Sequence, residues 1–288
     1  MLFQDPFQNF TVWDFVESGL YFMIVGFFIL LCFYFLFIRF RTSKKIYWLY
    51  FGLFFICFGI GRVFFIVYDF LAPELTGVSN VEMVALLMMY YRLATFFTWL
   101  GTACAVGVLG ILLFPPDTQS EEQEGKTKSI KKWLKIKNNQ KIIVRAVLIA
   151  IPVVIGILAL TLSDELFMDP DFQKPPPDGY SSTVNLITIQ FGSWTYPIGR
   201  FLLNFIFMPL FLALIPVMFI YLAKKTFGVL RKSYAWNAIG FLLYYAGRIL
   251  KGALDVAEFP HFRAILPTLI ILLALLILVI ANNYEQLK

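Results

Sequence analysis

Seven long runs of apolar residues, separated by short polar segments, dominate the chain. They cover residues 16–38, 46–71, 84–114, 143–163, 195–222, 234–256 and 262–282. Each run is close to the roughly 20 residues that a helix needs to cross the hydrocarbon core of a bilayer. Three prolines interrupt the fifth run, which still predicts a helix because neighbours in a bundle can satisfy the freed carbonyls. The pattern predicts an all-α integral membrane protein with seven transmembrane helices in one domain, residues 1–288.

The composition agrees with a membrane protein. The chain is 60% hydrophobic and only 15% charged, whereas soluble domains carry about 25% charged residues. The net charge of +6 does not indicate nucleic-acid binding, because the cations cluster in the loops between the apolar runs. Cys32, Cys57 and Cys104 all lie inside apolar runs, so we expect neither a disulfide framework nor a metal site.

The distribution of basic residues predicts the orientation in the membrane. Most of the 24 Lys and Arg residues follow the first, third and fifth runs, while the other loops are rich in Asp and Glu. Because cytoplasmic loops carry the excess of Lys and Arg, we expect an outside N-terminus and a cytoplasmic C-terminus in the cell membrane. The basic segment 126–142 is expected to belong to a solvated positive-inside loop with a short helical extension. Two alternatives stay open, a helix that lies on anionic headgroups and a contact site for a cytoplasmic protein partner. The outer segment 164–187, with its proline run, is predicted to be a stiff connector or lid.

Residues 45–69 and 231–255 align without gaps and predict an internal repeat. The alignment matches rare residues as well as aliphatic ones, and the pairs are Phe55 with Phe241, Phe58 with Tyr244, Gly61 with Gly247, Arg62 with Arg248, and Asp69 with Asp255. Each glycine is expected to let a neighbouring helix approach. The prediction is a first repeat at about 16–114, a linker span at 143–163 and a second repeat at 195–282, related by a pseudo-twofold axis along the membrane normal.

This 3+1+3 arrangement resembles, as topology over the whole chain, the microbial rhodopsins and, more loosely, the SWEET-type sugar carriers. Rhodopsins of this kind attach retinal through a lysine in the last span, and "AILPTLIILLALLILVIA" contains none. The duplicated Pro-Gln motif of relatives of the sugar carriers is absent as well. The resemblance therefore implies a shape and neither an activity nor a cofactor.

Ionisable residues inside the runs are candidates for function, because they are costly in a membrane. They occupy the middle and outer parts of the runs, whereas the cytoplasmic halves are almost entirely apolar. An arginine offers a planar fork of donors that suits carboxylate or phosphate. The predicted ligand-binding residues are Arg62, Arg92, Arg248 and Lys251, and the predicted supporting residues are Asp69, Asp255, Glu258 and Tyr244.

An outward-facing cavity with an apolar floor favours a receptor- or sensor-like protein for a small anionic ligand. Two alternatives stay open. The chain could be a transporter of a small polar or anionic solute, although transport requires polar groups along the whole route. The charged residues could also form a purely structural network. With a single histidine, His261, and no catalytic motif in the sequence, we do not expect an enzyme.

Overall fold

The computed structural model describes residues 12–75, 77–113, 138–176, 179–191, 194–256 and 260–283. Most of the basic segment 126–142 and the predicted site residue Glu258 lie outside the described residues. The backbone of Asp255 is described as helical, but its side chain is not.

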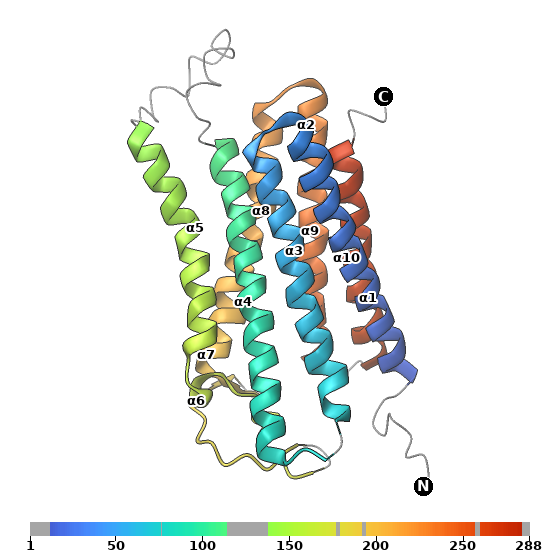
Figure 1. The fold of residues 1–288 in the computed structure, drawn as a ribbon, viewed down its shortest axis with the longest axis vertical. Helices are drawn as coiled ribbons and strands as arrows, with labels where there is room; N and C mark the ends of the chain where they lie inside the picture. The colour runs from blue at the N-terminus through green and yellow to red at the C-terminus, as the bar shows by residue number, and fades with distance from the viewer. Residues whose placement is uncertain are drawn as a thin grey trace.

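Long helices run up and down the molecule and cover each of the apolar runs (Figure 1). Their bounds, with the short segments that continue them, are α1 Val12–Phe33 with η1 Tyr34–Phe40 and α2 Arg41–Ser43; α3 Ile46–Ile66 with η2 Val67–Leu71 and η3 Ala72–Glu74; α4 Asn80–Leu113; α5 Asn138–Thr161; α7 Ile198–Phe201 with η7 Leu202–Phe207 and α8 Met208–Lys225; α9 Gly228–Val256; and α10 Pro260–Asn283.

Six of these helical stretches in the described part of the chain are long and apolar enough to cross a membrane. They begin at Val12, Ile46, Asn80, Gln140, Ile198 and Ile265. The chain is therefore a multi-pass helical membrane protein, as predicted. The stretch formed by α9 is long enough at 29 residues but more polar, since it carries Asn237, Arg248 and Lys251.

Six helices form a closed ring. Going round it, α1 packs against α3, α3 against α4, α4 against α8, α8 against α9, α9 against α10, and α10 against α1. Helix α5 packs against α4 from outside the ring, at the left of the view in Figure 1. The predicted linker span is thus peripheral to the ring formed by the two sets of three helices.

The glycine of each Gly-Arg pair lies where the next helix in the chain comes close. A Cβ added at Gly61 would be 3.1 Å from the carbonyl oxygen of Ala94 on α4. A Cβ added at Gly247 would be 3.0 Å from the carbonyl oxygen of Pro267 on α10 and 2.9 Å from Cγ1 of Ile271. The expectation that these glycines permit close helix packing is confirmed.

Replacing Gly247 by alanine is therefore expected to destabilise the protein by about 1–3 kcal/mol, because the α9–α10 contact must separate. Gly26 on α1 is the matched control, since a Cβ there meets nothing within 4 Å. Gly26→Ala should be neutral or slightly stabilising through its higher helix propensity. Melting temperatures of the two purified variants test this difference, and equal values would contradict it.

Aromatic side chains fill part of the interior of the helical ring. They lie between Arg62 and Arg248 on one side and the first turns of α3 and α9 on the other. Phe35 stacks on Phe51 and Phe55 with ring centroids 5.3 and 5.5 Å apart. Phe219 stacks on Phe241 at 5.4 Å. All five rings are buried. Together with Phe28, Phe54 and Phe58 they form what we call the inner aromatic core.

Polar side chains join helices at the end of the bundle where α10 ends. Arg39 donates to the Tyr34 hydroxyl at 2.6 Å and to the carbonyl oxygen of Asn282. Tyr34 also bonds Asn283, and the Asn282 amide donates to Oδ1 of Asn237 at 3.0 Å. These contacts, which we call the inner polar cluster, link α1, α9 and α10.

A segment without a long helix covers the opposite end of the bundle. This outer cap, the described residues of 164–197, contains α6 Asp164–Phe167, η6 Pro170–Gln173 and an antiparallel pair of strands, β1 Thr188–Phe191 and β2 Trp194–Pro197, in which Thr188 is opposite Pro197. Phe167 and Met168 of the cap are fully buried. Burial also raises the pKa of Tyr196 on β2 above its usual value.

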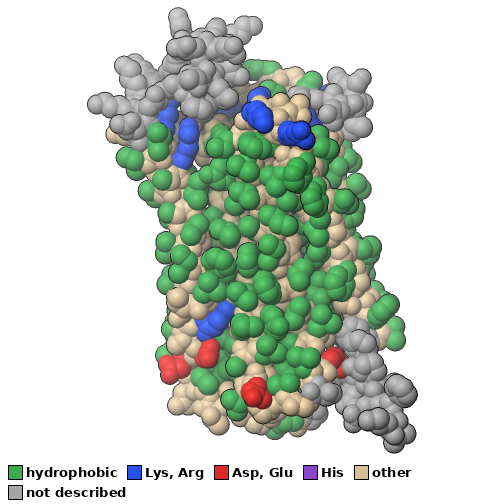
Figure 2. Space-filling view, viewed as in Figure 1, with side chains coloured by type: hydrophobic (Ala, Val, Ile, Leu, Met, Phe, Trp, Pro, Cys, Tyr) green, Lys and Arg blue, Asp and Glu red, His purple; other side chains and the backbone are tan. Residues whose placement is uncertain are grey.

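The two ends of the molecule differ in charge. Lys and Arg gather mostly at the end where α10 finishes, and Asp and Glu gather at the end of the outer cap, with an apolar band between them (Figure 2). The cationic end includes Arg41, Lys44 and Lys225, and the acidic end includes Glu74 and Glu165.

Candidate functional site

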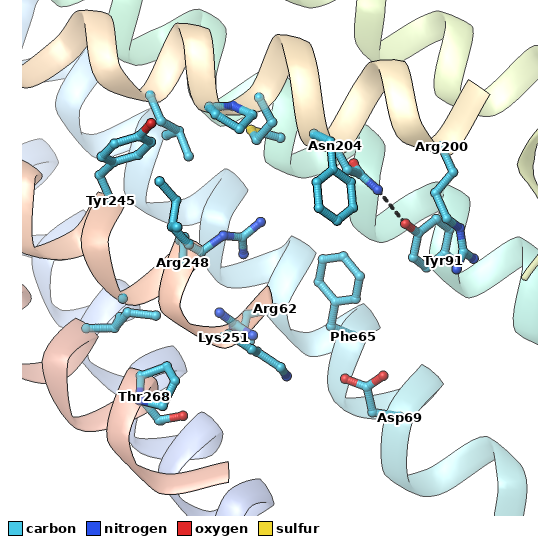
Figure 3. Close-up of a pocket in the computed structure, with 18 of the residues that line it drawn as sticks. Arg62, Phe65, Asp69, Tyr91, Arg200, Asn204, Tyr245, Arg248, Lys251 and Thr268 are labelled. Carbon is cyan, nitrogen blue, oxygen red and sulfur yellow. Dashed lines mark hydrogen bonds between the residues drawn. The ribbon is translucent and has the colours of Figure 1, made fainter. Parts of the chain in front are cut away.

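A cavity of about 680 Å³ lies inside the ring, between the inner aromatic core and the outer cap. Its lining comes from α1, α3 with η2, α4, the outer cap, α7 with η7 and α8, α9 and α10 (Figure 3). Its ionisable lining residues are Arg62, Asp69, Asp169, Arg200, Arg248 and Lys251, together with the tyrosines Tyr21, Tyr68, Tyr91, Tyr196 and Tyr245. Three of the four predicted ligand-binding residues therefore meet in one cavity.

Two arginines in this cavity have no carboxylate partner in the part of the chain that the structure describes. Arg62 on α3 is 8% exposed, and Arg248 lies on the facing side of the cavity, on α9 (Figure 3). Within the described residues, neither guanidinium group makes an ion pair or a hydrogen bond. Arg62 lies over the ring of Tyr21, 4.5 Å from its centroid. A buried charge is costly unless it is paired, so the cavity holds donors for an anion.

Lys251 is held in place by α1. Its Nζ lies 3.3 Å from Oε1 of Glu17 and donates to the hydroxyl of Tyr21. Tyr21 in turn donates to Glu17 at 2.6 Å. Because Glu17 is 6% exposed, this triad fixes the ammonium group at the edge of the cavity, one turn from Arg248 on the same helix.

Arg200 is anchored to the outer cap. It forms an ion pair with Asp169, and its Nε donates to the carbonyl oxygen of Phe167 at 3.2 Å. Its guanidinium carbon also lies 3.8 Å from the centroid of the Tyr91 ring. Arg200 is 3% exposed. Its Nη2 atom is buried and has no hydrogen-bond partner among the described residues. Arg200 therefore joins the cap to α4 and α7 and leaves one nitrogen of the guanidinium group unbonded.

Two of the π-helical segments contribute to the lining. Tyr68 and Asp69 lie on η2, while Asn204 and Phe205 lie on η7. The Asn204 amide donates to the hydroxyl of Tyr91 at 2.6 Å, as drawn in Figure 3. An extra residue in a helical turn re-aims the side chains around it, and such bulges are frequent at functional sites.

The remaining predicted residues lie elsewhere. Arg92 does not line the main cavity; it pairs with Asp164 at 2.7 Å and donates to the carbonyl oxygens of Ala159 and Leu160 at the end of α5. Its predicted role in the arginine pocket is therefore not supported by its position. Tyr244 is buried next to Phe58, with ring centroids 5.8 Å apart.

Several lining residues were not among the predicted site residues. Tyr21, Tyr91, Asn204 and Arg200 come from four different segments of the chain, α1, α4, η7 and α7. Arg200 and Asn204 are visible in the sequence as rare polar residues in the outer third of the fifth run. Tyr21 and Tyr91 carry no such mark among the 14 tyrosines.

The lining suits an organic or inorganic anion better than a metal ion. Nowhere in the described residues do three or more His, Cys, Asp or Glu side chains form a cluster that could hold a metal ion. The three cysteines are buried and unbridged. The chemistry of the cavity is therefore that of guanidinium, ammonium and phenol groups around a space bounded by apolar residues.

The fold and this cavity define the class as a multi-pass helical membrane protein with a buried, cation-lined chamber. Comparison with known proteins gives no closer assignment, since no family model matches the chain and neither a curated protein nor a solved structure is detectably similar to it.

Proposed function

We propose that the chain is a seven-transmembrane, receptor- or sensor-like protein whose cavity binds an anion from the outer side of the cell membrane. The observation that carries the proposal is the pair Arg62 and Arg248, which line one cavity and have no carboxylate partner among the described residues. Guanidinium groups on facing helices can bind one carboxylate or phosphate from both sides with charge-assisted hydrogen bonds.

The seventh span in this proposal is α9. It occupies a place in the ring between α8 and α10 and runs antiparallel to both (Figure 1). Its charged residues Arg248 and Lys251 turn toward the cavity rather than toward lipid. The cationic end of the bundle, with the C-terminal end of α10, supports a cytoplasmic C-terminus.

The proposed duplication has support from contacts between equivalent residues. Phe58 touches Tyr244, its partner in the alignment of the two halves, and Arg62 faces Arg248 across the cavity. Residues contact their own equivalents only near a twofold axis. The α4–α8 and α10–α1 contacts that close the ring are also equivalent under such an axis.

The half of the bundle that holds the inner aromatic core is closed, and this favours a receptor over a transporter. The inner aromatic core lies between the cavity and the inner polar cluster, and Thr95, Thr98 and Thr102 each bond a carbonyl of their own helix. A bound anion would draw α3 and α9 together, and their inner ends adjoin the basic loops. We propose that this shift reaches a cytoplasmic partner, with segment 126–142 as the candidate contact.

A transporter is the second candidate. The observation that favours it is the inner polar cluster, because hydrogen bonds such as that between Asn237 and Asn282 can be exchanged for water when an inner gate opens. A carrier would alternate access around the same site by rocking one repeat against the other.

A thermal-shift screen of the purified protein tests the proposal. We expect inorganic phosphate or small carboxylates to raise the melting temperature, because a ligand that binds only the folded state stabilises it. A neutral sugar at the same concentration should have no effect. Arg248→Gln should lose the shift, whereas Arg92→Gln should keep it, since Arg92 lies outside the cavity.

No anion-dependent shift in the native protein would contradict the proposal. Counterflow of the anion that binds, measured in liposomes, separates the two candidates. Saturable exchange that Arg248→Gln abolishes would establish the transporter in place of the receptor.

A further inference from the structure

Two half-exposed side chains border the cavity on neighbouring segments of the bundle. Phe205 on η7 and Ile249 on α9 both line the cavity, and each is 46% exposed. Pro209 at the start of α8 and Tyr245 on α9 also line the cavity. Side chains that border a cavity and stay half exposed are expected at the rim where a cavity opens.

The helices separate at this level. Over its own length α8 packs along α9, but η7 and α7, which continue the same span outward, make no extended backbone contact with α9 among the described residues. The π-helical turn of η7 and Pro209 at the start of α8 are features at which helices commonly kink. The ring of Phe205 packs on Tyr196 and Phe201, with centroids 5.1 and 5.7 Å away.

The depth of this opening matches the outer leaflet. Phe205 lies seven residues after Ile198, where its span begins, and Ile249 lies seven residues before the end of α9 at Val256. At 1.5 Å per residue, both are about 10 Å below the outer ends of their helices. The outer cap covers the end of the bundle next to the cavity, and its residues Phe167 and Met168 are fully buried.

We infer that the ligand is an amphipathic anion of the outer leaflet, which enters sideways between η7 and α9. This inference rests on the proposed function. The phosphate or carboxylate head would bind Arg62 and Arg248 inside the cavity. The acyl or alkyl tail would pass over Phe205, Pro209, Tyr245 and Ile249 into the bilayer. Aromatic and aliphatic residues suit the hydrocarbon chain of such a ligand, while the guanidinium groups of Arg62 and Arg248 suit only its anionic head.

The test uses the full chain in nanodiscs and compares dodecyl phosphate with inorganic phosphate. Dodecyl phosphate partitions into the bilayer and meets the opening at high local concentration. We expect its half-saturation concentration, measured by thermal shift, to be at least about a hundredfold below that of inorganic phosphate. Ile249→Trp, which fills the path of the tail, should raise the half-saturation concentration of dodecyl phosphate by about tenfold and leave that of inorganic phosphate unchanged.

Leu242→Trp is the matched control, because Leu242 is 43% exposed on the same helix but does not line the cavity; it should change neither value. Equal half-saturation by both phosphates with no effect of Ile249→Trp would overturn the lateral route and leave anion binding in place. A dodecyl phosphate shift that persists in Arg248→Gln would mean binding by the tail alone and would overturn the inference. No shift with either phosphate would overturn it together with the proposed function.

Discussion

Arg200→Gln is expected to destabilise the protein by about 3–5 kcal/mol, the largest loss of any single substitution considered for this chain. Removing one partner of a buried ion pair leaves the other charge uncompensated. Here the guanidinium group also bonds the Phe167 carbonyl and lies on the Tyr91 ring. The change would therefore release Asp169 and weaken the attachment of the outer cap to α4 and α7 at once.

The control is an exposed ion pair in the same outer cap. Lys174 and Asp171 are 2.7 Å apart, with side chains 58% and 65% exposed. Exposed pairs contribute about 0–1 kcal/mol, so Lys174→Met should leave stability almost unchanged. Thermal and denaturant unfolding of both purified variants measures the difference. Similar small losses in the two would show that the cap is not held by Arg200.

Arg62→Gln and Arg248→Gln should have the opposite profile, with loss of ligand binding and no loss of stability. Each substitution removes a charge lining the cavity that the described residues leave without a carboxylate partner. The unliganded variants should therefore be as stable as the native protein or slightly more stable. Losing one partner of a buried, hydrogen-bonded charge pair costs about 2–5 kcal/mol, which predicts a fall in anion affinity of at least about thirtyfold.

This pattern separates a binding site from a structural charge network. If the two arginines fixed the packing of the helices, both variants would melt well below the native protein, whether or not an anion is present. Arg62→Gln also removes the contact with the Tyr21 ring, so Arg248→Gln is the cleaner of the two. Marked destabilisation by Arg248→Gln would favour the structural alternative.

Six helices long and apolar enough to cross a membrane could be predicted from the sequence, because a membrane helix needs a long apolar run and that requirement is local. Their bounds agree with the helices to within a few residues; for example, the predicted span 46–71 lies within Ile46–Glu74. The close packing at Gly61 and Gly247 could also be predicted, since glycine within an apolar helix so often marks a contact with another helix.

Partners could not be predicted, because they depend on which helices meet in the ring. Arg62 and Arg92 look alike in the sequence, yet Arg92 turns outward to Asp164 while Arg62 turns inward to the cavity. Glu17 and Lys251 are separated by more than two hundred positions along the chain and meet only because α1 packs beside α10, next to α9. The π-helical segment η7, beside which we propose the ligand enters, is a local feature that no apolar pattern reveals.

The central claim is that Arg62 and Arg248 bind one anion between them, and a crystal structure grown with selenate tests it most directly. The anomalous scattering of selenium locates the anion independently of the protein atoms. We predict one peak in the cavity, with selenate oxygens at hydrogen-bond distance, about 2.7–3.2 Å, from both guanidinium groups. A cavity without such a peak, with a carboxylate of the chain bound to both arginines, would contradict the account.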